Sequence, residues 1–177
     1  MRLVVALAMM LALTACAVER TVYTAENEVE VIRIKPNPPA QVYEALDKLG
    51  LNEYQHRTVL RQYMNGFDPG RLEWCAAFAN AVLNQSGQPH NYDHSRPWLA
   101  RSFLDWGEEV DDPQTGDVVV FPRGNSEWQG HVGFYMDSIV IDDVVYYRIL
   151  GGNQNNSVSI DMYRASKALG IRRASTI

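Results

Sequence analysis

Cysteine, long apolar runs and basic residues are all scarce in this sequence. Two of the 177 residues are cysteines, too few for a framework of several disulfides. The longest apolar run, residues 3–13, is well short of the roughly 20 residues that a membrane-spanning helix needs. The 16 Lys and Arg are outnumbered by 21 Asp and Glu, and no basic patch is present. The composition therefore gives no reason to expect nucleic acid as a partner.

The amino-terminal stretch "MRLVVALAMMLALTAC" has the composition of an export signal. Arg2 precedes the apolar run, and small residues follow it up to Cys16. The end of this stretch resembles the lipobox of bacterial lipoproteins, which are cut before the cysteine and lipidated on it. Residues 1–15 are thus predicted to be a lipoprotein signal peptide, with ordinary cleavage nearby as the alternative. By the same resemblance, Ala17 favours a lipid-anchored place in the cell envelope, at the outer membrane and facing the periplasm.

Residues 16–38 are predicted to form the lipidated cysteine and an extended tether, because "KPNPPA" places three prolines within four residues. Residues 39–177 are then one globular domain, which suits a chain that is 46% hydrophobic and 21% charged. If Cys16 carries lipid, Cys75 has no partner for a disulfide within the chain. An unpaired thiol in an oxidising envelope calls for another explanation.

The domain changes from helical to strand-like patterning along its length. Helical periodicity indicates helices over residues 40–50 and 53–64, in "EWCAAFANAVLNQSG", and over a short stretch in "PWLARSFLDWG". Five β-branched or aromatic runs follow: "GDVVVF", "HVGFYMDSIVI", "VVYYRIL", "SVSIDMY" and "GIRRAS". Helices followed by a series of strands predict an α+β domain with an antiparallel sheet.

Cys75 lies in the first turn of the third predicted helix. Unpaired N–H groups and the helix dipole at that position stabilise a thiolate, which is the form of cysteine that attacks carbonyl groups. A buried, inert cysteine is the alternative.

A thiol nucleophile needs a nearby base, and a third group usually orients that base. Of the four histidines, His131 begins a predicted strand in "GHVGFY", where Gly130 and Gly133 leave space near its ring. The segment "GGNQNN" follows another predicted strand and offers Asn153, and secondly Gln154, to accept a hydrogen bond from the ring. A structural histidine and a simple glycine-asparagine turn are the alternatives.

His90 and His94, with Asp93 between them, have a spacing that suits zinc only on a helix. Pro89 and Asn91 favour a loop instead, so no metal and no cofactor are predicted.

Taken together, Trp74-Cys75-Ala76-Ala77-Phe78, "ARSFLDWG", "PQTGDVVVFPRG", "GHVGFY" and "LGGNQNNSVSI" resemble the NlpC/P60 and CHAP superfamily of cysteine peptidases and amidases. These enzymes cut bacterial cell-wall peptides, and the likeness extends over most of residues 40–173. The resemblance implies a papain-like core, a helix with the nucleophile packed on an antiparallel sheet.

By this resemblance Cys75 is the nucleophile, His131 the general base and then acid, and Asn153 the orienting group. Trp74 and Gln154 are candidates for lining the substrate groove. No histidine follows His131, whereas strict NlpC/P60 enzymes commonly use a histidine as the third residue; an asparagine resembles the CHAP side. The loop "QPHNYDHSRPW" looks longer than the family's usual connection and is expected to shape a distinctive groove.

The predicted function is hydrolysis of an amide bond in peptidoglycan stem peptides, by an endopeptidase or amidase that forms a thioester on Cys75. Two alternatives stay open at this point. One is a non-catalytic peptidoglycan-binding or scaffolding lipoprotein with the same fold, and the other is an acyltransferase that uses the same thioester. Neither the bond that is cut nor an oligomeric state follows from the sequence.

Overall fold

The computed structural model describes residues 18–23, 29–34 and 37–175. The predicted signal peptide and Cys16 lie outside these residues. Within the described part of the chain, no helix is both long and apolar enough to cross a membrane.

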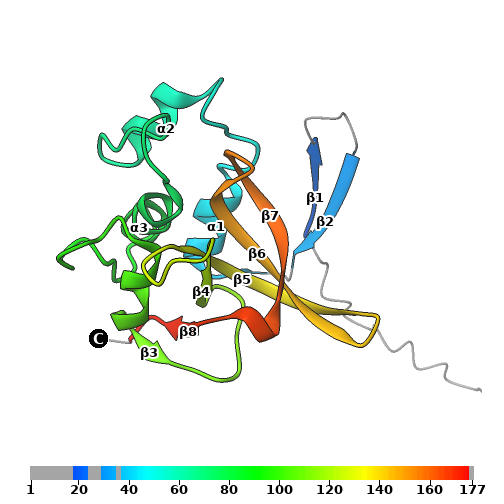
Figure 1. The fold of residues 1–177 in the computed structure, drawn as a ribbon. Helices are drawn as coiled ribbons and strands as arrows, with labels where there is room; N and C mark the ends of the chain where they lie inside the picture. The colour runs from blue at the N-terminus through cyan, green and yellow to red at the C-terminus, as the bar shows by residue number, and fades with distance from the viewer. Residues whose placement is uncertain (1–17, 24–28, 35–36, 176–177) are drawn as a thin grey trace, which may run out of the picture.

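Six antiparallel strands form the main sheet, in the order β3-β8-β4-β5-β6-β7 (Figure 1). Their bounds are β3 Glu108–Glu109, β4 Val118–Pro122, β5 Gly130–Ile141, β6 Val144–Gln154, β7 Ser157–Arg164 and β8 Gly170–Arg173. The last five coincide with the five predicted strand runs. The α+β class and the papain-like arrangement are thereby confirmed.

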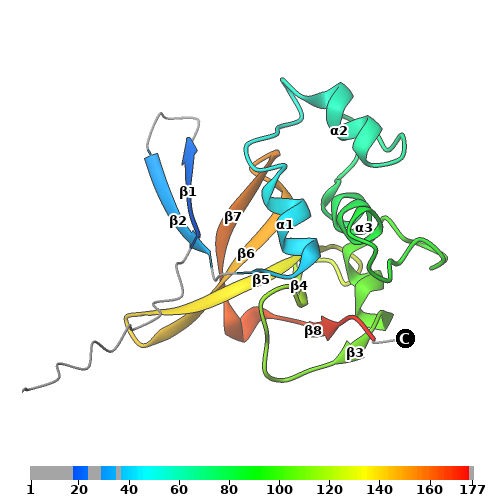
Figure 2. The same cartoon turned by 180° about the vertical axis from the view of Figure 1, so that it is seen from behind.

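Helices cover one face of this sheet (Figure 2). The buried cluster on that face joins α3 (Cys75–Gln85), α1 (Ala40–Leu46) and the 3₁₀ helix η1 (Ala100–Asp105) to the sheet. Side chains alternate along β4, so Val118 and Val120 pack under the helices, while Val119 and Phe121 join a smaller cluster on the other face. Helix α3 is thus fixed to the sheet through its buried side.

Two of the helices are shorter than their periodicity predicts. Helix α1 ends before Gly50, whose positive φ of 83° turns the chain so that its N–H donates to the Val158 carbonyl in β7. Helix α2 is Arg57–Tyr63, because the Asn52 side chain accepts hydrogen bonds from the N–H groups of Tyr54 and Gln55 and holds a turn there. Local side-chain hydrogen bonding has replaced the first helical turn.

Strands β1 (Val18–Tyr23) and β2 (Val29–Ile34) pair antiparallel in a separate two-stranded sheet. The sequence predicts an extended tether in this region. In the structure, these two segments pair with each other and do not form a single extended chain.

Candidate active site

Cys75 is the first residue of α3 and is only 3% exposed. Its Sγ lies 4.0 Å from the carbonyl oxygen of Gly130, and the N–H of Val132 is within hydrogen-bonding reach of the sulfur. The thiol therefore lies against the backbone on both sides of His131. The helix has brought together two residues that are 56 positions apart in the sequence.

Several groups act on the protonation of this thiol. Burial raises the pKa of Cys75, and the N–H groups of Val132 and Ala76 and the charge of Arg123 oppose that rise. Burial is the largest of these effects, so the resting thiol is protonated at neutral pH. The first-turn N–H groups have no acceptor within the helix and remain available to a developing negative charge.

His131 lies at the start of β5, opposite Phe121 of β4, and is 2% exposed. Its ring stacks on Tyr163, with centroids 5.2 Å apart, and Tyr163 stacks in turn on Phe121. Burial, and to a smaller extent the charge of Arg123, lower the pKa of His131, and the hydrogen bond with Gln154 opposes them; together they bring the pKa to about 4. The resting ring is therefore neutral and able to accept a proton.

Gln154 defines which nitrogen of that ring accepts the proton. Its Oε1 lies 3.0 Å from Nε2 of His131. Its own amide nitrogen donates to the carbonyls of Ser159 and Ile149, which fixes the orientation of the amide. A carbonyl oxygen can only accept, so Nε2 carries the hydrogen and Nδ1 keeps its lone pair. Nδ1 is buried without a hydrogen-bond partner in the described part of the protein, so its lone pair is free to accept a proton.

The prediction that Asn153 lies against the ring is corrected by a β-bulge. Between Gly151 and Gln154 the register with β7 shifts, and Asn153 adopts a φ of 59°. Regular alternation would place Gly151 and Asn153 on one face of the strand. The extra residue instead turns Gln154 toward the same side as Gly151, and toward the ring of His131. Gln154 is thus the partner of His131 and does not line a groove, since it is 2% exposed.

Asn153 belongs to a polar cluster beside the site. Its side-chain amide donates to Oε2 of Glu73 at 2.5 Å, and Arg123 forms an ion pair with the same oxygen. Arg123 also donates to the carbonyl of Asn153 at 3.1 Å. The cluster ties the segment before Cys75, the end of β4 and the bulge of β6 to one another.

Residues 67–153 match the family model described as the CHAP domain. This chain contains a CHAP domain. No curated protein and no solved structure was found that matches the chain.

The matched region of the CHAP domain includes Cys75 and His131 and ends one residue before Gln154. CHAP domains are typically hydrolases that act on peptidoglycan. The family match therefore supports the predicted class of enzyme, a hydrolase, and the predicted substrate, peptidoglycan.

Trp74 is corrected from a groove residue to a core residue of the CHAP domain. Its side chain is fully buried, and its indole N–H donates to Glu53 at 2.9 Å. A Cβ on Gly152 would lie 2.6 Å from the indole ring, so the strand packs directly on it. Trp74 therefore supports α3 against β6 and offers no surface to a substrate.

The histidines of the loop before η1 have partners within the CHAP domain. Nε2 of His94 lies 3.5 Å from a carboxylate oxygen of Asp105, and Nδ1 of His90 accepts a weak bond of 3.4 Å from the N–H of Tyr92. Over residues 18–23, 29–34 and 37–175, no group of three or more His, Cys, Asp or Glu side chains is placed to hold a metal ion.

Sequence reasoning missed Glu73, Arg123 and Tyr163. The local sequence gives no signal for Tyr163, which reaches the site through strand register, and it marks Glu73 only by its place two residues before Cys75. A clue was present in "FPRG", where Arg123 directly follows the strand that pairs with the one containing His131.

Proposed function

We propose that this CHAP domain hydrolyses an amide bond in peptidoglycan stem peptides through a thioester on Cys75. The observation that supports the proposal is the single tautomer of His131, with Nε2–H bound to Gln154 and a buried Nδ1 that has no partner among the described residues, next to the backbone against which the Cys75 thiol lies. A neutral thiol beside a neutral imidazole suits general-base activation, in which the proton moves as the sulfur attacks.

In the first half of the proposed reaction, the thiol proton passes to Nδ1 while Sγ bonds to the substrate carbonyl carbon. The oxyanion accepts hydrogen bonds from first-turn N–H groups of α3, and one such donor is worth about 3 kcal/mol in other enzymes. The proton on Nδ1 then passes to the amide nitrogen as the C–N bond breaks. An amine leaves, and the acyl group remains on sulfur.

In the second half, His131 takes a proton from water as the water oxygen attacks the thioester. The carbon–sulfur bond breaks, a carboxylic acid leaves, and the thiol regains its proton. Peptide fragments released from isolated cell walls by the protein and by Cys75→Ala, compared by mass spectrometry, test the proposal. The variant is expected to release no more than buffer does, and equal release would contradict the mechanism.

A non-catalytic wall-binding role is the second candidate, favoured by the burial that raises the pKa of the Cys75 thiol. Labelling with an electrophilic thiol probe at neutral pH separates the two functions. If Cys75 is catalytic, the probe is expected to label the unmodified protein much faster than the Gln154→Ala variant, because in the variant His131 loses the partner that holds its tautomer. Equally slow labelling of both proteins would favour the binding role.

The location of the domain forms a further part of the proposal. Lipid on Cys16 would hold the domain at the outer membrane, facing the periplasm, and residues 16–38 would connect the two. The motif "LTAC" supports this location. Metabolic labelling with a fatty-acid analogue is expected to mark the protein and to leave Cys16→Ala unmarked, whereas labelling of both would exclude anchoring at Cys16.

A further inference from the structure

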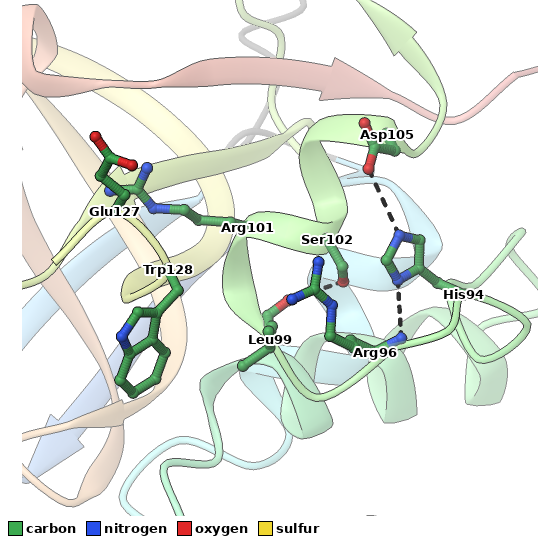
Figure 3. A pocket seen from close by; sticks show the side chains of 8 residues that line it. All are labelled: His94, Arg96, Leu99, Arg101, Ser102, Asp105, Glu127 and Trp128. Atoms are coloured by element: carbon green, nitrogen blue, oxygen red, sulfur yellow. Dashed lines mark hydrogen bonds and ion pairs between the residues drawn. The ribbon is translucent and has the colours of Figure 1, made fainter.

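A cavity of about 380 Å³, lined by both charged and apolar side chains, lies between the loop before η1 and the loop before β5 (Figure 3). His94, Arg96 and Leu99 contribute from the first side, and Glu127 and Trp128 from the second. Neither the catalytic mechanism nor the core uses this cavity. It includes part of the loop "QPHNYDHSRPW", which the sequence predicts to shape a distinctive groove.

The cavity is adjacent to the catalytic segment. Arg101, on η1, lines it and donates from Nε to the carbonyl of Gln129 at 2.7 Å. A Cβ on the next residue, Gly130, would lie 3.1 Å from the Arg101 side chain, and the carbonyl oxygen of Gly130 is 4.0 Å from Sγ of Cys75. Gly130 therefore connects the wall of the cavity to the backbone against which the thiol lies.

The two arginines of the cavity, Arg96 and Arg101, lack the carboxylate partner that most other arginines of the described chain have. Six arginines, namely Arg57, Arg71, Arg123, Arg148, Arg172 and Arg173, lie within 4.0 Å of a carboxylate. Arg101 donates only to backbone carbonyls, and Arg96 forms no side-chain hydrogen bond or ion pair with a described residue. Two guanidinium groups thus face one cavity without a carboxylate of the protein bound to either.

The opposite wall is aromatic. Trp128 is 60% exposed, and Figure 3 shows its indole across the cavity from Arg96, with Leu99 beside that arginine. An exposed indole supplies apolar contact area for a peptide chain at little cost in conformational entropy. The carboxylates of Glu127, on the same loop, and of Asp105, on η1, also line the cavity, and they disfavour a ligand with negative charge along its whole length. A ligand with a localised carboxylate suits the cavity best.

We propose that this cavity is a substrate subsite that binds a free carboxylate of a peptidoglycan stem peptide, through Arg96 and with the peptide chain against Trp128. The inference rests on the proposed function for the class of ligand. Arg96 is the specificity-determining residue, and Arg101 holds the wall of the cavity in place.

Binding to the full-length protein with Cys75→Ala tests the inference without turnover. The two probes are a muramyl stem peptide with free carboxylates and the same peptide with its carboxylates converted to amides, both measured by calorimetry. The free acid is expected to bind about tenfold more tightly than the amide, because hydrogen bonds between charged groups are the stronger ones. Adding Arg96→Gln is expected to remove that preference, and adding Arg61→Gln, which removes one exposed charge from α2, to keep it.

Equal binding of acid and amide, no binding of either, or a preference that survives Arg96→Gln would overturn the inference. Failure of the proposed function gives a different result. In that case the intact protein would not cleave the peptide, yet the preference for the free acid and its dependence on Arg96 would still be measured.

Discussion

The amide of Gln154 determines the chemistry available to His131. Its nitrogen is engaged by backbone carbonyls of β6 and β7, so only its oxygen can face the ring. With the hydrogen held on Nε2, the lone pair on Nδ1 is free, and in the proposed mechanism it serves as the base. A single buried amide thereby assigns the two ring nitrogens their separate roles.

Replacing Gln154 should impair the reaction much more than replacing its neighbour. Gln154→Ala is expected to lower kcat/KM roughly 100-fold, because the ring loses the partner that fixes its tautomer. Asn153→Gly is the matched control, since glycine keeps the left-handed backbone and removes only the side chain. Steady-state kinetics on a stem peptide measure both variants. A larger loss in Asn153→Gly than in Gln154→Ala would contradict the assignment.

The charge of Arg123 should set the pH dependence of the activity. This charge acts with burial to bring the pKa of His131 down to about 4, and it also lowers the pKa of Cys75. Because His131 must be neutral to act as the base, kcat/KM is expected to rise with pH through about 4. In Arg123→Gln the acidic limb should move to higher pH, toward the ordinary histidine value of about 6.5.

Profiles of kcat/KM from pH 3.5 to 7.5 check this expectation, with Arg61→Gln as a control for the loss of one exposed charge. In the control, the acidic limb of the kcat/KM profile should lie at the same pH as in the unmodified protein. An unmoved limb in Arg123→Gln would show that Arg123 does not act on His131 electrostatically.

At the scale of elements, the bulge at the end of β6 marks where sequence reasoning failed. Strand alternation correctly predicts that a polar side chain after Leu150 reaches His131, but it selects Asn153. The inserted residue depends on pairing with β7, which a single strand pattern does not reveal. The same limit applies to Gly133, whose missing side chain makes room for Ile149 of β6 and not for a substrate.

The two glycines of "GGNQ" are predicted to differ in their tolerance of a methyl group. A Cβ on Gly152 would approach both the Trp74 ring and the Cβ of Phe78 to within 2.7 Å, and neither can move without displacing α3. Gly152→Ala is therefore expected to lower the free energy of unfolding by about 1–3 kcal/mol. Gly151→Ala is the control, because its Cβ would make only ordinary contacts of 3.4 Å.

Urea denaturation of the two glycine variants compares these costs. Gly151→Ala should unfold close to the urea midpoint of the parent protein. Equal midpoints for both variants would mean that α3 is not packed tightly on β6 at this point.

For the whole molecule, periodicity predicted the sheet better than it predicted the helices. The last five strands follow β-branched or aromatic runs, and β4, where four successive residues are buried, is covered on both faces. Helix α1 is shorter than predicted because the chain reverses at Gly50, and α2 is shorter because the Asn52 side chain holds a turn in place of the first helical turn. The full set of site residues could not be predicted from the sequence, because Glu73, Arg123 and Tyr163 come together only after the sheet is assembled.

Burial of a neutral His131 should make the stability of the whole domain depend on pH. Its pKa is about 4 when folded and about 6.5 when unfolded, so the unfolded chain binds more protons between these values. Stability is therefore expected to fall as the pH drops from 6.5 to 4, by about 3 kcal/mol from this residue. Urea denaturation at several pH values measures the slope. His131→Phe, which keeps a ring against Tyr163, should show a shallower slope, and an identical slope would contradict the assignment.

The central claim is that Cys75 forms a thioester with the acyl part of a stem peptide, and intact-protein mass spectrometry tests it most directly. The protein is mixed with peptide and quenched in acid within the first turnovers. A mass increase equal to the acyl fragment is expected, mapping to the peptide that contains Cys75 and absent from Cys75→Ala. Release of cleaved peptide by the unmodified protein with no such adduct, or an adduct that persists in Cys75→Ala, would contradict the account.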